Sequence, residues 1–202
     1  MRALAERVGP VDVLVNDIWG GDALAEWGVP FWEQTPSKGL ELVDRVLRTH
    51  VLTARHVRVR DGGLIVEVTD GDSDRYRDNL FYDLAKVIPI RLALALDAEL
   101  KGRATAVAVT PGFLRSEAML DHFGVTEATW RDAIAKDPNF AESETPLYVG
   151  RAVAALAADP HVARKGGKVF ASWTLAKEYG FADADGRRPD WGTHFASLQA
   201  HS

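Results

Sequence analysis

A chain of 202 residues, 47% hydrophobic and 26% charged, has the composition of a globular domain large enough to bury a core. The formal net charge of −5 argues against nucleic acid or an anionic membrane as partner, and the absence of cysteine excludes disulfides and thiolate chemistry. No apolar run reaches the roughly 20 residues needed to cross a bilayer, and residues 1–8 lack the apolar core of a signal peptide, so we expect a cytoplasmic protein.

Predicted strands and helices alternate along the chain. Leu4 and Val8 have the pattern of a helix end, which Gly9-Pro10 stops. Short apolar runs predict strands at Val11–Asn16, 64–69, 104–110 and 168–171. Helices are predicted at 39–60 and 80–100, as fragments within 113–140, and from Pro146 to about residue 158. We expect a turn at 61–63, a polar loop at 70–79, and a loop-like tail beyond residue 171.

This alternation predicts an α/β fold, a parallel sheet with crossover helices on its faces. Ligands of such sheets bind beyond the carboxyl ends of the strands. Asn16, Thr69 and the Pro111-Gly112 pair all follow predicted strand ends, and the helix that starts near Tyr82 follows the second one. We therefore expect the functional site among these residues.

The loop after the first strand is unusually aromatic, with Trp19, Trp27, Phe31 and Trp32. These side chains either hold a long loop against the core or form an aromatic rim over a pocket. The sequence leaves both interpretations open.

Tyr82 and Lys86 stand four residues apart on a predicted helix, so they share one face of it. A nearby ammonium favours the phenolate, so we expect Lys86 to lower the pKa of Tyr82 and to tune it for proton transfer near neutral pH. Pairs with this spacing also occur by chance, as a surface tyrosine beside a solvated lysine. The Tyr82–Lys86 pair therefore indicates a functional site only together with the motifs around it.

These motifs together resemble the short-chain dehydrogenase/reductase family, from Val11 to about Ser172. The Tyr82-x-x-x-Lys86 pair matches the catalytic pair of the family, and Thr69 stands thirteen residues before the tyrosine, where the family usually has serine. The strand ending in Asn16 is similar to the one that leads into the family's Asn-Asn-Ala-Gly motif, of which only the first Asn is retained.

The resemblance implies a role for each matching residue. Tyr82 would be the acid/base at a carbonyl or alcohol oxygen, Lys86 would lower its pKa and bind the nicotinamide ribose, and Thr69 would hold the substrate oxygen. Asn16 and Lys86, together with the Pro111-Gly112-x-x-x-Ser116 segment, would contact NAD or NADP. The implied substrate is a small, apolar carbonyl or alcohol compound, and no metal is implied.

The sequence departs from the family in two places. It has no Thr-Gly-x-x-x-Gly-x-Gly loop for the pyrophosphate, and Val46 aligns with the helix Asn of the family's proton relay. We therefore expect one partial Rossmann-like domain over residues 1–202, truncated to the later strands, 4-5-6-7 in family order, with 113–142 as a helical substrate lid. NAD(P) binding by this chain alone is expected to be weak.

Three hypotheses remain open: a truncated reductase, a cofactor-independent proton-transfer enzyme such as an isomerase, dehydratase or cyclase, and a non-catalytic binding protein. We also expect a homo-oligomer, because Val11–Asn16 would present an unpaired apolar strand edge unless another segment of the chain covers it. In the family, helices corresponding to 39–60 and 80–100 commonly form a dimer interface.

Overall fold

The computed structural model describes residues 6–7, 9–57 and 59–200, so the helix end expected at Leu4 and Val8 lies outside the described residues. The chain divides into two compact units, each described here by itself. The first comprises Met1–Val109 and Asp159–Val169, and the second Thr110–Ala158 and Phe170–Ser202. The single domain over residues 1–202 stays a prediction.

The sheet confirms the predicted α/β class. Its strands lie in the order β1-β2-β3-β4, which is also their chain order: β1 (Val11–Asn16), β2 (Val59–Val68), β3 (Thr105–Thr110) and β4 (Val169–Ala171). β1 pairs with β2 and β2 with β3, both in parallel, which places Leu14, Ile65 and Ala106 side by side in one hydrophobic cluster. All six residues of β3 are buried, as expected for a parallel strand covered on both faces.

β2 begins earlier than predicted. Val11 pairs with Val59 but Val13 pairs with Leu64, so the intervening residues of β2 form an irregularity. Gly62 has φ 78°, a left-handed conformation that glycine adopts without steric cost, and its N–H donates to the carbonyl of Arg103. The turn predicted at 61–63 is therefore a bulge within a longer strand.

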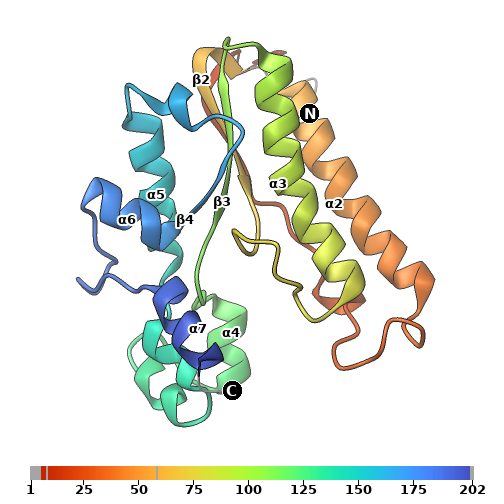
Figure 1. Cartoon of the computed structure of the whole chain (residues 1–202), viewed down its shortest axis with the longest axis vertical. Coiled ribbons are helices and arrows are strands. Elements are labelled where there is room, and N and C mark those ends of the chain that lie inside the picture. Colours follow the sequence, from red (N-terminus) through yellow and green to blue (C-terminus); the bar gives the residue numbers. More distant parts are fainter. Residues whose placement is uncertain (1–5, 8, 58, 201–202) are drawn as a thin grey trace. The chain divides into compact units, whose positions relative to one another are not determined.

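Two long helices of the first unit pack against each other, α2 (Pro36–His56) and α3 (Leu80–Leu100) (Figure 1). Leu42 and Val46 of α2 meet Ala85 of α3 in a buried cluster. α3 has its predicted bounds, whereas α2 begins three residues before and ends four residues before its prediction. The short 3₁₀ helices η1 (Asp22–Leu24) and η4 (Val162–Lys165) also belong to this unit.

The second unit is helical. It contains α4 (Glu117–Phe123), η2 (Trp130–Ala135), η3 (Pro138–Glu142), α5 (Pro146–Ala158), α6 (Ser172–Tyr179) and α7 (Trp191–Gln199). The helical character predicted for 113–140 and the helix starting at Pro146 are thus confirmed, and the loop predicted beyond residue 171 is found at 180–190, between α6 and α7, which were not predicted. α6 and α7 are short helices, too brief to show a clear apolar periodicity.

Trp130, Ala133 and Phe140 form the buried cluster of the 113–142 segment. Trp130 therefore belongs to a local core, and the substrate-lid role of the segment stays a prediction. Across the described residues of both units, no helix is both long and apolar enough to span a membrane.

Candidate active site in the first unit

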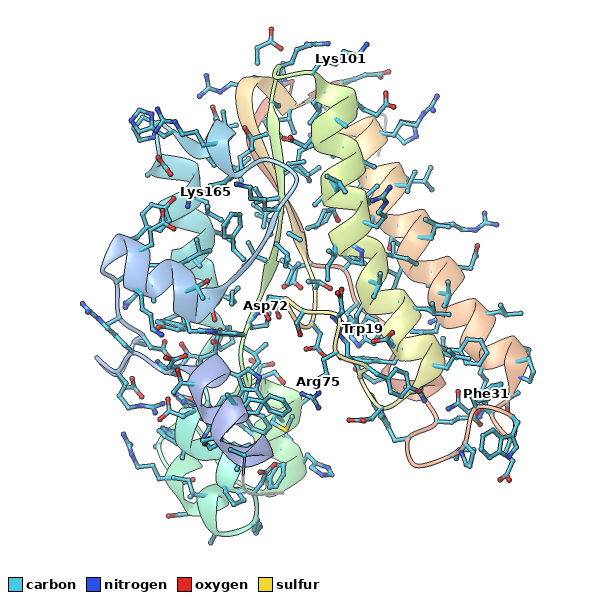
Figure 2. All side chains as sticks on the ribbon, viewed as in Figure 1. Trp19, Phe31, Asp72, Arg75, Lys101 and Lys165 are labelled. Atoms are coloured by element: carbon cyan, nitrogen blue, oxygen red, sulfur yellow. The ribbon has the colours of Figure 1, made fainter. Side chains whose placement is uncertain are left out.

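Hydrogen bonds hold Tyr82, on the first turn of α3, at its main-chain N–H and at its hydroxyl. The side-chain oxygen of Asn79 accepts a hydrogen bond from the Tyr82 N–H at 3.0 Å and caps the helix. The Tyr82 hydroxyl donates to Oδ2 of Asp70 at 2.7 Å. The rings of Trp19 and Trp27 lie against the phenol, with centroids 5.5 and 4.8 Å from its own, and Figure 2 labels Trp19. The aromatic side chains nearest Tyr82 thus serve as walls of the site.

The surroundings of Tyr82 favour its neutral form. Burial raises the pKa of the phenol, and the charge and hydrogen bond of Asp70 raise it further, while Arg77 opposes them. The expected net lowering of this pKa is wrong for this arrangement, because the phenol is buried and a carboxylate rather than an ammonium meets its hydroxyl. At neutral pH the tyrosine is a proton donor.

Lys86 lies one turn further along α3 and contacts aromatic rings. Its Nζ is 3.6 Å from the ring centroid of Trp19 and 5.3 Å from that of Tyr82, which are cation–π contacts. Burial lowers the pKa of Lys86, and the carboxylates of Asp70 and Asp17 raise it. No hydrogen bond of this ammonium is found within the described part of the chain, so its N–H groups remain able to donate to a ligand hydroxyl.

Thr69 follows β2 and is buried beside α3. Its hydroxyl donates to the main-chain carbonyl of Lys86, and its N–H donates to the carbonyl of Val109 at 2.9 Å. The Thr69 hydroxyl proton is therefore already engaged in a hydrogen bond within the protein. A hydrogen bond from Thr69 to a substrate oxygen requires that hydroxyl to leave the Lys86 carbonyl.

Asn16, at the end of β1, has its side chain wholly buried. Its amide donates to Oε1 of Glu67 at 2.8 Å, and Oε2 of Glu67 lies 2.5 Å from Nδ1 of His50. This buried group joins β1, β2 and α2. The Asn16 amide thus donates to a buried group of the protein interior, and the expected contact of Asn16 with the cofactor stays a prediction.

Gly112 of the second unit is fixed by a buried carboxylate. Its N–H donates to Oε2 of Glu144 at 2.9 Å, and the Ser172 hydroxyl donates to the same oxygen at 2.6 Å. A Cβ on Gly112 would press against Trp191 and Glu144, which explains the glycine. Ser116 caps α4, since its side chain accepts the N–H of Met119 at 3.2 Å.

Two mammalian proteins are similar to the chain over most or all of its length. Dehydrogenase/reductase SDR family member 1 of Homo sapiens is 33% identical over 216 residues, covering 100% of this chain and 68% of that protein. The chain belongs to the short-chain dehydrogenase/reductase family. The Mus musculus counterpart is 34% identical over 191 residues, covering 90% of this chain but only 61% of that protein. No family model matches the sequence.

Solved structures of short-chain dehydrogenases/reductases share the fold. An angucycline C-6 ketoreductase with bound NADP is 26% identical with a TM-score of 0.63, covering 85% of this chain and 65% of that one. A short-chain dehydrogenase/reductase from Brucella melitensis, described as a glucose/ribitol dehydrogenase, is 19% identical with a TM-score of 0.62, covering 84% and 65%. The chain thus spans slightly less than two thirds of the length of these structures.

In this short-chain dehydrogenase/reductase the three expected catalytic residues come together. Thr69, Tyr82 and Lys86 all lie at the start of α3 or beside it, joined by the bond from Thr69 to the Lys86 carbonyl. The expected cofactor residues are divided: Asn16 and Lys86 belong to the first unit, and Pro111, Gly112 and Ser116 to the second.

Asp70, which contacts the phenol directly, is not among the site residues predicted from the sequence. A signal was present, because an Asp directly after the strand-end Thr69 is a polar residue in the position where ligand-binding groups gather. The buried Glu67, which interrupts the apolar run of β2, is not among them either.

Proposed function

We propose that this chain carries the acid–base chemistry of an NAD(P)-dependent oxidoreductase that interconverts a small apolar carbonyl compound and its alcohol. The proposal rests on the position of Tyr82, a protonated phenol on the first turn of α3, with Lys86 one helical turn further along. The relatives support the class of reaction by their names, and the tryptophan walls support an apolar substrate.

The residues present fit one end of the cofactor. The Lys86 ammonium, largely buried and without a hydrogen-bond acceptor in the described structure, suits the hydroxyls of the nicotinamide ribose. NAD(P) supplies or accepts the hydride when bound. The roles of Asn16, Pro111, Gly112 and Ser116 toward the cofactor rest on the family resemblance.

In the reducing direction the Tyr82 hydroxyl turns from Asp70 and gives its proton to the carbonyl oxygen as the alcohol forms. Lys86 then stabilises the phenolate by its charge, since its Nζ lies 5.3 Å from the phenol ring centroid. In the oxidising direction the phenolate takes the alcohol proton. Thr69 holds the substrate oxygen once its hydroxyl turns away from the Lys86 carbonyl.

Replacing Tyr82 tests this proposal. Tyr82→Phe removes the proton donor and keeps the ring between Trp19 and Trp27, so we expect carbonyl reduction to fall by about 100-fold or more with the fold intact. The measurement is NADH or NADPH consumption with a panel of apolar ketones and aldehydes, beside circular dichroism. Tyr76→Phe, an exposed tyrosine of the preceding loop, is the control and should keep full activity. Undiminished turnover in Tyr82→Phe would exclude the mechanism.

The second candidate is cofactor-independent proton transfer, as in an isomerase, dehydratase or cyclase. It is favoured by the Tyr82–Asp70 hydrogen bond, which places an acid and a base in contact without any cofactor. Adding or omitting nucleotide decides between the two, because only the oxidoreductase requires it. Titration with NADH and NADPH by calorimetry measures binding directly.

Self-association through the first unit is also part of the proposal. β1 stands at one end of the strand order, and α2 and α3 carry exposed apolar side chains. Both features are of the kind that pair with a second copy of a chain.

A further inference from the structure

Asp70 contacts the phenol that the proposed reaction depends on. Its Oδ2 lies 2.7 Å from the Tyr82 hydroxyl, whereas the Lys86 ammonium lies over the rings of Trp19 and Tyr82 and is not bonded to that hydroxyl. The orientation of the phenolic proton is therefore set by a carboxylate. A lysine alone would leave the hydroxyl free to rotate.

The main chain on both sides of Asp70 is fixed. Thr69, directly before it, is bonded to Val109 and to the Lys86 carbonyl. The Asp70 carbonyl accepts a hydrogen bond from Nε of Arg77, whose Nη1 donates to Asp83 of α3 at 2.8 Å. Arg77 thus ties the loop to the helix through the backbone of Asp70 and leaves the Asp70 carboxylate to Tyr82.

We propose that Asp70 is a positioning residue of this site, an inference that rests on the proposed function. Its carboxylate orients the Tyr82 hydroxyl and keeps it protonated. The Tyr82 hydroxyl keeps its proton at rest and exchanges the Asp70 oxygen for the substrate oxygen when the proton is transferred. The reverse reaction needs the phenolate, which the Asp70 charge opposes. Asp70 thereby opposes the oxidising direction at neutral pH.

The other charges around the phenol agree with this direction. Asp22, from η1, also raises the pKa of Tyr82, and Arg77 from the loop lowers it. Lys86, from α3, is the remaining cation, and its ammonium is itself destabilised by burial. Burial and two carboxylates therefore outweigh Arg77, and the carboxylate in direct contact is Asp70.

The test follows the ionisation of Tyr82 itself. The chain is labelled with ¹³C at the tyrosine Cζ, the Tyr82 signal is assigned by its loss in Tyr82→Phe, and pH is raised while circular dichroism stays constant. In the unmodified chain we expect the Tyr82 signal to keep its neutral position to about pH 11, above the reference pKa near 10. In Asp70→Asn it should titrate at least about one pH unit lower than in the unmodified chain.

Asp72→Asn is the matched control, since Asp72 is an exposed carboxylate of the same loop and is labelled in Figure 2. It should leave the Tyr82 titration unchanged. An unmodified chain in which Tyr82 ionises near pH 10, or an Asp70→Asn variant that titrates like the unmodified chain, would overturn the proposal. The unmodified-chain measurement holds even if Asp70→Asn does not fold.

Activity gives a separate readout. If the chain oxidises an alcohol, the pH at which that rate is half-maximal should shift downward in Asp70→Asn and stay fixed in Asp72→Asn. The tyrosine titration needs no turnover, so an inactive chain would count against the proposed function while the titration still decides the role of Asp70.

Discussion

Glu144 is a fully buried carboxyl group of the second unit, and it fixes Gly112. Burial raises its pKa to about 7, although the hydrogen bonds from Ser172 and Gly112 lower it in part. The folded state therefore binds the Glu144 proton more tightly than the unfolded chain, whose reference value is 4.5. Its contribution to the free energy of unfolding is largest below about pH 4.5 and is lost as pH rises toward 7.

We predict that Glu144→Gln removes this loss, since the amide keeps the shape of the group and cannot ionise. Between pH 5 and pH 8 the unmodified chain should lose about 2.5 kcal/mol more of its free energy of unfolding than the variant. Urea unfolding at both pH values measures the difference. Glu33→Gln, at an exposed position, should behave like the unmodified chain, and an identical pH dependence in Glu144→Gln would contradict the assignment.

Among the elements, α2 and α3 approach each other closely at Gly39. A Cβ at this position would overlap the ring of Phe81, directly before Tyr82 on α3. The glycine therefore sets the distance between the helix that carries the site and its neighbour. Gly150 in α5 is a contrasting helical glycine, because a Cβ there would meet open space.

We predict opposite effects of the same substitution at these two positions. Gly39→Ala should cost about 1–3 kcal/mol in the free energy of unfolding, because the Phe81 ring must shift. Gly150→Ala should gain about 0.5–1 kcal/mol, because alanine has the higher helix propensity and restricts the unfolded chain. Chemical denaturation of both variants measures the effects. Equal stabilities would show that the helices adjust freely at Gly39.

At the scale of the whole molecule, α2 and α3 are notable because they expose several apolar side chains to solvent. The exposed apolar side chains of α2 and α3 are Leu40, Leu47, Val51, Leu52, Leu84, Val87 and Leu94. Leu40, Leu47 and Val51 are spaced by seven and four residues, so they share one face of α2. Exposed apolar side chains gathered on two neighbouring helices are typical of a protein–protein contact.

We predict that the chain self-associates through this surface and that Leu47→Glu with Val87→Glu shifts it to a smaller species. Buried charge without a partner would oppose the contact, by several kcal/mol for the pair. Size-exclusion chromatography with light scattering gives the mass. Leu147→Glu, at an exposed leucine of α5, is the control and should leave the mass unchanged. A monomeric unmodified chain would refute the prediction.

The sequence by itself determined the elements whose signals are local. The apolar runs located the strands and the apolar stripe located α3, so Tyr82 and Lys86 were found on one helix face. The short helices α6 and α7 were not predicted because fewer than ten residues show little periodicity.

Only the tertiary structure decided the chemistry of the phenol. The Tyr82–Asp70 bond spans twelve residues and depends on a loop that Arg77 folds back onto α3. Helix spacing alone pointed to Lys86 as the partner and to a lowered pKa. Charge interactions and desolvation depend on distance and burial in three dimensions, and these were set by the loop and by Trp19.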